Sequence, residues 1–245
     1  MDPLLSYQTP VKKSARIFTD GVKAGIPIAI GYMPIALTFG LIARTTGLTF
    51  MDAVGMSVFV YAGASQFMAL QMLAAETGAI EIIIATFIVN IRHFLMSASI
   101  NERTVERSRW KKAAMAFGIT DETFSVASLN RDKIEAAFMG GLILMSYGSW
   151  VVFSGLGYVI GASLPEVLQK SMSIALYAMF IGLVVPSLKK ERKALALFIL
   201  SAILCSVFSL FIPFGWAIVA ATLISSVTIE WAYGRLMKKE GEAHV

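Results

Sequence analysis

The sequence predicts an all-α integral membrane protein with about seven to eight transmembrane or re-entrant helices. Of its 245 residues, 57% are hydrophobic and only 15% are charged, and the mean hydropathy is +0.72. A soluble domain of this length could not bury so much apolar surface. The apolar runs are about 18–25 residues long, which suits helices and not the short alternating strands of a barrel. We expect one polytopic domain over residues 18–232, between cytoplasmic tails at 1–17 and 233–245.

The first predicted span, residues 21–43, is rich in glycine and proline. Pro27 and Pro34 each free the backbone carbonyl four residues earlier, and at bilayer depth such a carbonyl must find a partner in protein, water or ligand. We therefore expect a kinked or broken helix here.

The second predicted span, residues 49–73, begins with a capping pattern, Thr49-x-x-Asp52. Its centre places Tyr61, Ser65 and Gln66 beside small residues, and Gly63 could let the helix unwind. These three polar side chains are candidates for substrate contact. Hydrogen bonds between helices are the alternative explanation for them.

The third predicted span, residues 79–100, carries Asn90, Arg92 and His93 in an apolar run. A charge at bilayer depth costs roughly 2.5–3.5 kcal/mol on insertion scales, so Arg92 should face protein or a polar cavity. It could bind a substrate carboxylate, pair with an acidic residue, or have a purely structural role. His93 is either a buried, hydrogen-bonded histidine or a proton carrier, because its ordinary pKa is about 6.5.

The segment 113–129 is moderately apolar and is interrupted at Gly118, where a helix can end, before Thr120 or Asp121 caps the next. It is predicted to be a broken or re-entrant helix. Asp121 and Glu122 would be favourable in a first helical turn without any ligand. They could also bind a substrate ammonium or carry a coupling proton.

Charge leaves the topology of the first half open. The amino tail and the basic loop 101–112 both prefer the cytoplasm, yet three full crossings between them would separate the two. Either one early segment does not cross, or 113–129 crosses and the loop lies outside; we favour the second. Further spans are expected at 134–162, 171–188, 194–212 and 214–231, and a faint internal repeat has a spacing of about 115 residues.

Several classes of function find no support in the sequence. Cys205 is the single cysteine, and the histidines are His93 and His244, so neither a disulfide within the chain nor a histidine-rich metal site is expected. There is no phosphate-binding glycine loop and no nucleophile elbow, so we expect no cofactor and no catalytic residues. The net charge of +5 comes from basic clusters between apolar runs, which is typical of cytoplasmic loops and not of a nucleic-acid-binding surface.

Four motifs in order resemble the AzlC family, the large subunit of two-component branched-chain amino-acid exporters. They are Gly25-Ile-Pro27 with Gly31-Tyr32-x-Pro34 and Phe39-Gly40, Tyr61-Ala-Gly-Ala-Ser-Gln-Phe67, Arg92-His93, and Phe117-Gly118-x-Thr120-Asp121-Glu122-x-Phe124. The resemblance covers residues 21–130, and the later spans agree in length and hydropathy only.

The resemblance implies a secondary exporter of valine, leucine, isoleucine and related apolar amino acids such as methionine, in the inner membrane. It also implies a small AzlD-type membrane subunit and, since there is no nucleotide-binding motif, coupling to protons. The alternatives are an exporter of another small metabolite, a non-transporting scaffold, or an intramembrane enzyme. The candidate substrate-binding residues are Arg92, Asn90, Tyr61, Ser65, Gln66, Thr120 and Asp121, the proton-coupling candidates are His93, Asp121 and Glu122, and the helix-break candidates are Pro27, Pro34, Gly63 and Gly118.

Overall fold

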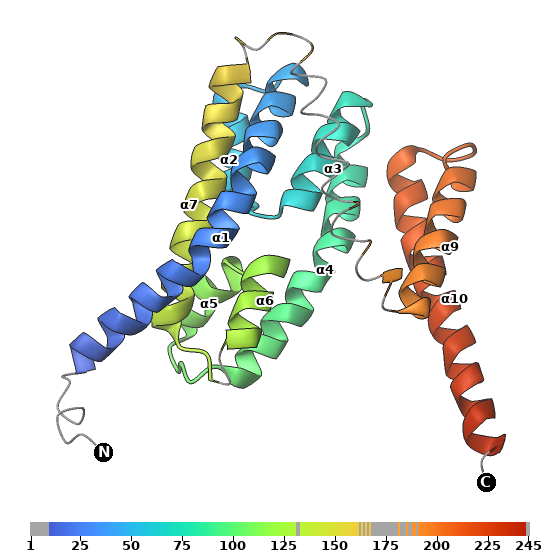
Figure 1. Ribbon diagram of the computed structural model, residues 1–245. Coiled ribbons are helices and arrows are strands. Elements are labelled where there is room, and N and C mark those ends of the chain that lie inside the picture. The colour runs from blue at the N-terminus through green and yellow to red at the C-terminus, as the bar shows by residue number, and fades with distance from the viewer. Residues whose placement is uncertain are drawn as a thin grey trace. The chain divides into compact units, whose positions relative to one another are not determined.

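The computed structural model describes residues 10–130, 133–161, 163, 165, 167, 181, 185, 188–189 and 191–243. Regular structure in this part of the chain is helical, without a strand, and four of the helices are long and apolar enough to cross a membrane (Figure 1). The predicted all-α membrane fold is therefore confirmed. The helices are α1 (Pro10–Thr45), α2 (Phe50–Phe59), α3 (Gly63–Ala74), α4 (Ala79–Arg103), α5 (Arg109–Phe117), α6 (Asp121–Asn130), α7 (Ala136–Gly161), α9 (Arg192–Phe208) and α10 (Phe214–Ala243).

Backbone contacts divide the chain into two compact units. The first comprises Met1–Phe67 and Val89–Gln169, and the second comprises Met68–Ile88 and Lys170–Val245. The helices α3 and α4 each contribute to both. The single membrane domain expected over residues 18–232 stays a prediction.

In the second unit, α9 and α10 form an antiparallel pair. Ser201 and Ser225 share a hydrogen bond of 2.6 Å, and Lys193 forms an ion pair with Glu230 near the start of α9. Val219 of α10 packs with Met72 and Ala85 in a small apolar core. These helices match the predicted spans 194–212 and 214–231, whereas most of 171–188 lies outside the described residues.

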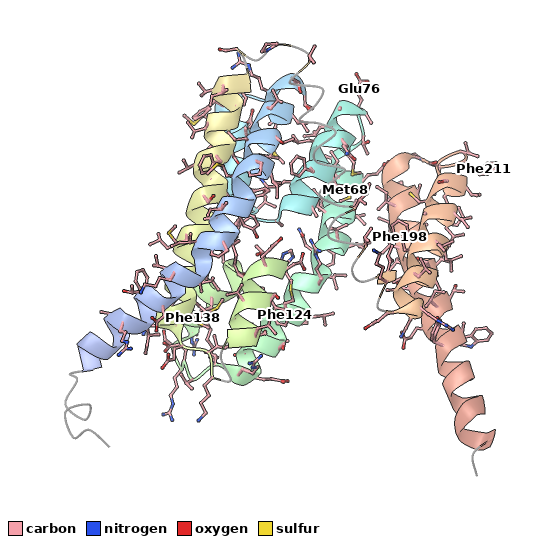
Figure 2. All side chains as sticks on the ribbon, in the orientation of Figure 1. Met68, Glu76, Phe124, Phe138, Phe198 and Phe211 are labelled. Carbon is pink, nitrogen blue, oxygen red and sulfur yellow. The ribbon has the colours of Figure 1, made fainter. Side chains whose placement is uncertain are left out.

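In the first unit, α1 and α7 pack along each other in the same direction. Near their starts, a Cβ atom on Gly21 would overlap the backbone carbonyl of Phe138, a residue labelled in Figure 2. Near their ends, a Cβ on Gly157 would overlap the carbonyl oxygen of Leu37. Glycine is required at these points because the two backbones touch, as in other small-residue seams between membrane helices.

Helix α1 contains both prolines and yet continues without interruption from Pro10 to Thr45. Figure 1 shows its axis changing direction along its length, so the helix is kinked and not broken. Ser149 of α7 donates a hydrogen bond of 2.7 Å to the carbonyl of Ala29, between the two prolines. A side chain of the neighbouring helix thus serves a backbone carbonyl of the kinked region, as the bilayer interior requires.

The predicted second span is a hairpin of two short helices, and a single crossing over residues 49–73 is wrong. Helices α2 and α3 have 10 and 12 residues, so each is only about 15–18 Å long and cannot span a bilayer of about 30 Å. Gln66 of α3 donates to Ser57 of α2, which places the two helices antiparallel. We call α2 and α3 the first hairpin; its N-terminal capping box at Thr49 and Asp52 is present as predicted.

A second hairpin is formed by α5 and α6. Helix α5 runs back along α4, since Lys112 donates to Asn101 near its start. Helix α6 then returns in the direction of α4, since Asp121 pairs with Arg92 and Arg103 donates to the carbonyl of Ser128. The segment 113–129 is therefore re-entrant, and the crossing that we favoured from the sequence is wrong.

With two hairpins that enter and return, the basic segments come together. One cavity of 700 Å³ is lined by Ser14 of α1, Glu106 and Lys111 of the loop and α5, and Glu135 before α7. The start of α1, the loop 101–112 and the start of α7 therefore lie at one end of the first unit. The conflict between the charge rule and the predicted topology disappears, because only α1 and α4 cross between the amino tail and this loop.

The glycine seam can be tested with a matched pair of substitutions. Gly157→Ala should destabilise the protein by about 1–3 kcal/mol, because the new methyl group meets backbone that cannot move aside. Gly148→Ala on the same helix should have little effect, since nothing lies within 4 Å of its Cβ position. Thermal unfolding in detergent would measure both, and equal effects would contradict the seam.

The hairpin topology predicts which loops share a side of the membrane. In a Cys205→Ser background, single cysteines replacing Ser14 and Val105 should react with an impermeant thiol reagent from the same side. A cysteine replacing Thr45, at the far end of α1, should react from the other side. Labelling of the Val105 and Thr45 positions from one side would refute the re-entrant arrangement.

Candidate functional site

The breaks of the two hairpins meet halfway along α1 and α7. The ring of Tyr61, in the first break, lies 6.4 Å from that of Phe117 at the end of α5. Tyr147 of α7 contacts both, at 5.0 Å from Tyr61 and 5.7 Å from Phe117. Four short helices therefore end or begin around one point, each presenting backbone groups that its own helix cannot satisfy.

The first break consists of Val60, Tyr61 and Ala62. Tyr61 has a φ of 35°, and a bulky residue in this left-handed region stores about 1–3 kcal/mol of strain. The side chain is held there because only 3% of its surface is exposed. The chain thus unwinds just before Gly63, whose small size is needed because the Trp150 ring packs against it.

The second break contains Gly118, Ile119 and Thr120. Gly118 caps α5 with an ordinary φ of −86°, which any residue could adopt. Glycine is needed here because a Cβ atom would overlap the side chain of Ile143. Thr120 and Thr123 cap α6 reciprocally, the hydroxyl of each accepting the backbone N–H of the other at 3.2 and 2.8 Å. Thr120 is therefore the cap, and Asp121 and Glu122 occupy the first turn, where a negative charge is favourable.

An ion pair joins α4 to the second hairpin. Arg92 Nη1 lies 2.7 Å from Asp121 Oδ2, and 44% and 48% of the two side chains are exposed. The acidic partner anticipated for Arg92 is therefore present. Because both side chains stay accessible, a ligand can reach either charge without displacing buried structure.

The neighbouring acid, Glu122, faces α1. The Tyr32 hydroxyl donates to Glu122 Oε2 at 2.6 Å and lies 2.8 Å from the Thr120 hydroxyl. Tyr32 is 6% exposed, and its ring contacts those of Tyr61 and Trp150. Adjacent acids on one helical turn therefore have different surroundings: Asp121 pairs with an accessible cation, and Glu122 is bound by a buried phenol.

Gln66 belongs to a buried network that fastens the first hairpin to α7. It accepts from the Trp150 indole at 2.9 Å and donates to Ser57, which donates to Ser154 at 2.8 Å. Gln66, Ser57 and Ser154 are fully buried. Both ends of the Gln66 amide are thus occupied by protein, which supports the structural explanation for this residue.

Asn90 and Ser65 hold α4 against the start of α3. Asn90 Nδ2 donates to Ser65 Oγ at 3.1 Å, and Ser65 Oγ donates to the carbonyl of Ala62 in the break. Two buried oxygens at the centre, Tyr61 Oη and Asn90 Oδ1, have no hydrogen-bond partner among the residues that the structure describes. The hydroxyls of Tyr32, Thr120 and Ser146 lie close to Tyr61 Oη without hydrogen-bonding geometry. Such groups require a partner, which water or a ligand can supply.

His93 lies one residue beyond the ion pair on α4 and is partly buried. It interacts electrostatically with Arg92, Asp121 and Glu122. The three proton-coupling candidates therefore lie within one neighbourhood. In the part of the chain that the structure describes, no group of three or more His, Cys, Asp or Glu side chains is arranged to hold a metal ion.

Two cavities lie on either side of α5 and extend toward the second break. A cavity of 340 Å³ between α4 and α5 extends from Asn101 and Lys112 to Ile119. The cavity of 700 Å³ on the other face of α5 extends to Ile143, which covers Gly118. At its mouth, the backbone N–H of Ser108 donates to Glu106 and lowers the pKa of that carboxyl group. Both cavities therefore extend from the basic end of the unit to residues next to the second break.

Sequence reasoning missed the aromatic residues of α1 and α7. Tyr32 binds Glu122, Trp150 binds Gln66, and Tyr147 donates to the Val58 carbonyl beside the first break. A signal for Trp150 was available, because a tryptophan in the middle of a span is unusual; this residue type gathers at the membrane interface.

The sequence of this chain is similar to those of known membrane proteins. The model of the family described as AzlC protein matches residues 27–164. The inner membrane protein YgaZ of Escherichia coli is 31% identical over 71% of this chain and 75% of its own, and an uncharacterized membrane protein of Archaeoglobus fulgidus is 36% identical over 73% and 79%. The branched-chain amino acid transport protein AzlC of Bacillus subtilis is 25% identical over 69% and 66%. No solved structure matches.

Proposed function

This chain belongs to the AzlC family, and we propose that it is a membrane transporter that exports branched-chain amino acids. Valine, leucine and isoleucine are the proposed substrates, with methionine as a further one. The transporter works with a small AzlD-type subunit and uses the proton gradient. One observation carries the proposal: an accessible ion pair, Arg92 with Asp121, lies where two broken hairpins meet.

An ion pair of this kind offers both charges that a zwitterion needs. The guanidinium of Arg92 can bind a carboxylate in bidentate fashion, and Asp121 can bind an ammonium group. The amino acid would insert between the two side chains and replace one ion pair by two. The cost of separating Arg92 from Asp121 is small because both are half exposed.

The surrounding rings can select the side chain of the substrate. Tyr61, Phe117 and Tyr147 form an aromatic cluster where the two breaks meet, and an apolar pocket discriminates by about 1–3 kcal/mol per methylene group. A branched aliphatic side chain would bury its surface there. The unpaired hydroxyl of Tyr61 can bind the polar end of the same ligand.

The acidic residues at the start of α6 are the groups that would carry the coupling proton. We assign the coupling proton to Glu122, because Asp121 is paired with Arg92, whereas Glu122 accepts a hydrogen bond from the neutral Tyr32 hydroxyl. Protonation of Glu122 would remove a charge from the centre of the membrane and free the hairpin to move. His93, which interacts electrostatically with Glu122, is a further candidate for carrying this proton.

The orientation follows from charge. Arg16, Arg107, Lys111 and Lys133 lie among the residues at the basic end of the first unit, where α1 begins and the loop 101–112 lies. Cytoplasmic loops carry such an excess of basic residues, so we place this end, the amino tail and the carboxyl tail in the cytoplasm and the protein in the inner membrane. The cavities beside α5 then open toward the cytoplasm, the side from which an exporter takes its substrate.

Substitution of the ion pair should abolish export. Efflux of preloaded isotopic valine, measured in vesicles that hold both subunits, should fall roughly tenfold or more for Arg92→Ala and Asp121→Asn, because each change leaves one charge of the substrate without a partner. Arg107→Ala, in the basic loop, is the matched control and should transport normally.

Unchanged efflux in both variants at equal membrane abundance would reject the ion pair as the binding site. Omitting the small subunit should also abolish efflux if the partner is required. A panel of competing amino acids and dipeptides would expose an exporter of a different metabolite, since only true substrates should inhibit efflux.

Substitution of the proposed proton carrier should uncouple transport from the gradient. Glu122→Gln keeps a hydrogen-bond acceptor for Tyr32 but cannot titrate. Valine exchange between the two sides should persist, whereas efflux driven by a pH difference should lose its dependence on that difference. Glu106→Gln, outside the spans, serves as the control; a normal pH response of the Glu122→Gln protein would assign the proton to another group.

A further inference from the structure

The described residues contain an inverted repeat with an offset of about 58 residues. Each copy is a broken hairpin followed by a long helix. Helix α5 begins at Arg109, 59 residues after Phe50; α6 at Asp121, 58 after Gly63; and α7 at Ala136, 57 after Ala79. The corresponding helices also agree in length, with 10 and 9, 12 and 10, and 25 and 26 residues. The repeat expected at about 115 residues, which pairs Gly25 with Gly140, Gly40-Leu41 with Gly155-Leu156 and Tyr61-Ala62 with Tyr177-Ala178, stays a prediction, and its last pair lies outside the described residues.

The two copies have opposite directions. Helix α2 runs antiparallel to α7, since Tyr147 donates to Val58 and the ring of Tyr158 packs on Phe50. Because α3 returns along α2 and α4 returns along α3, α4 is antiparallel to α7. The first hairpin therefore enters from one end and the second from the other, as Figure 1 shows. Inverted repeats of this kind underlie alternating access in many transporters.

The repeat relates two contacts that share no chemistry. Gly63 and Asp121 are the first residues of α3 and α6, and Arg92 and Trp150, 58 residues apart, lie 13 and 14 residues after the starts of α4 and α7. Arg92 of the first copy contacts Asp121 of the second. Trp150 of the second copy contacts Gly63 of the first, where a Cβ would lie 2.8 Å from its ring. A two-fold axis would exchange these two contacts.

The two contacts differ in how deeply they are buried. The ion pair is half exposed, and cavities of 340 and 700 Å³ lead toward its hairpin. Trp150 is 3% exposed, and its ring contacts that of Tyr32 edge-on. Its indole N–H donates a hydrogen bond to Gln66, which in turn donates one to the buried Ser57. In this conformation the contact at the second hairpin is half exposed, whereas the contact at the first hairpin is buried.

We propose that Trp150, seated on Gly63 and hydrogen-bonded to Gln66, is the latch of a second gate, formed by the first hairpin and equivalent to the gate at Arg92 and Asp121. Release of the latch lets the first hairpin move away from α7 and opens the central site toward the end of α1 that carries Thr45. This inference rests on the proposed function, because a gate on the second side is meaningful only for a transporter. Trp150 acts as a positioning residue and need not touch the substrate.

Accessibility of the first break tests the latch without measuring transport. In a Cys205→Ser background, Ala62→Cys is buried and should react slowly with an impermeant thiol reagent applied from the side of Thr45. Adding Trp150→Ala should speed this reaction at least tenfold. Trp216→Ala, in the second unit, is the matched control and should leave the rate unchanged. A rate that does not rise with Trp150→Ala overturns the proposal, whatever the protein transports.

A cross-link provides a second test that keeps Trp150 in place. Ser57 and Ser154 have their hydroxyl oxygens 2.8 Å apart across the gate, so the double cysteine variant can be joined by oxidation. Joining should stop valine efflux, and reduction should restore it. Full efflux by the cross-linked protein would overturn the gate while leaving the transport proposal intact. Absence of efflux from the unmodified protein would instead reject the transport proposal, and the labelling rates would still decide the latch.

Discussion

The structure depends on one constraint: backbone that leaves the helical ladder at bilayer depth must find its partners inside the protein. Both hairpins break near the centre of the first unit, and Tyr61, Ala62, Ile119 and Thr120 in the two breaks are buried. Thr120 and Thr123 satisfy one helix start, and Ser65 and Tyr147 donate to carbonyls at the other. The same requirement explains the close seam of α1 and α7, which supplies the wall on which both breaks rest.

Polar side chains at the centre fall into two groups that differ in accessibility. Gln66, Ser57 and Ser154 have all their bonds within the protein, and removing any of them would leave a buried group unsatisfied. Arg92 and Asp121 bond to each other and stay half exposed. The first group fixes the scaffold, and the second is free to exchange partners with a ligand. This division is the physical basis for our proposal that substrate binds at α4 and α6.

Charge and topology also agree once the hairpins are known. A hairpin that enters and returns changes the count of crossings without changing the hydropathy of the sequence. The basic loop 101–112 therefore joins the start of α1 at one end of the first unit, as the lining of the larger cavity indicates. The basic loop 101–112 then follows the rule that basic residues gather on the cytoplasmic side, and it is no longer an exception to that rule.

The fold class, the position of the polar stretch at Asn90–His93, the cap at Thr49 and the break at Gly118 could all be predicted from the sequence, because each depends on local composition or on spacing along a helix. Pairing of Arg92 with an acid could be anticipated, since a charge at that depth needs a partner. The reversal of the chain after α2 and after α5 could be learned only from contacts in three dimensions, because hydropathy measures how apolar a segment is and not its direction. The same holds for the roles of Tyr32 and Trp150, since their partners, Glu122 and Gln66, lie 90 and 84 residues away in the chain.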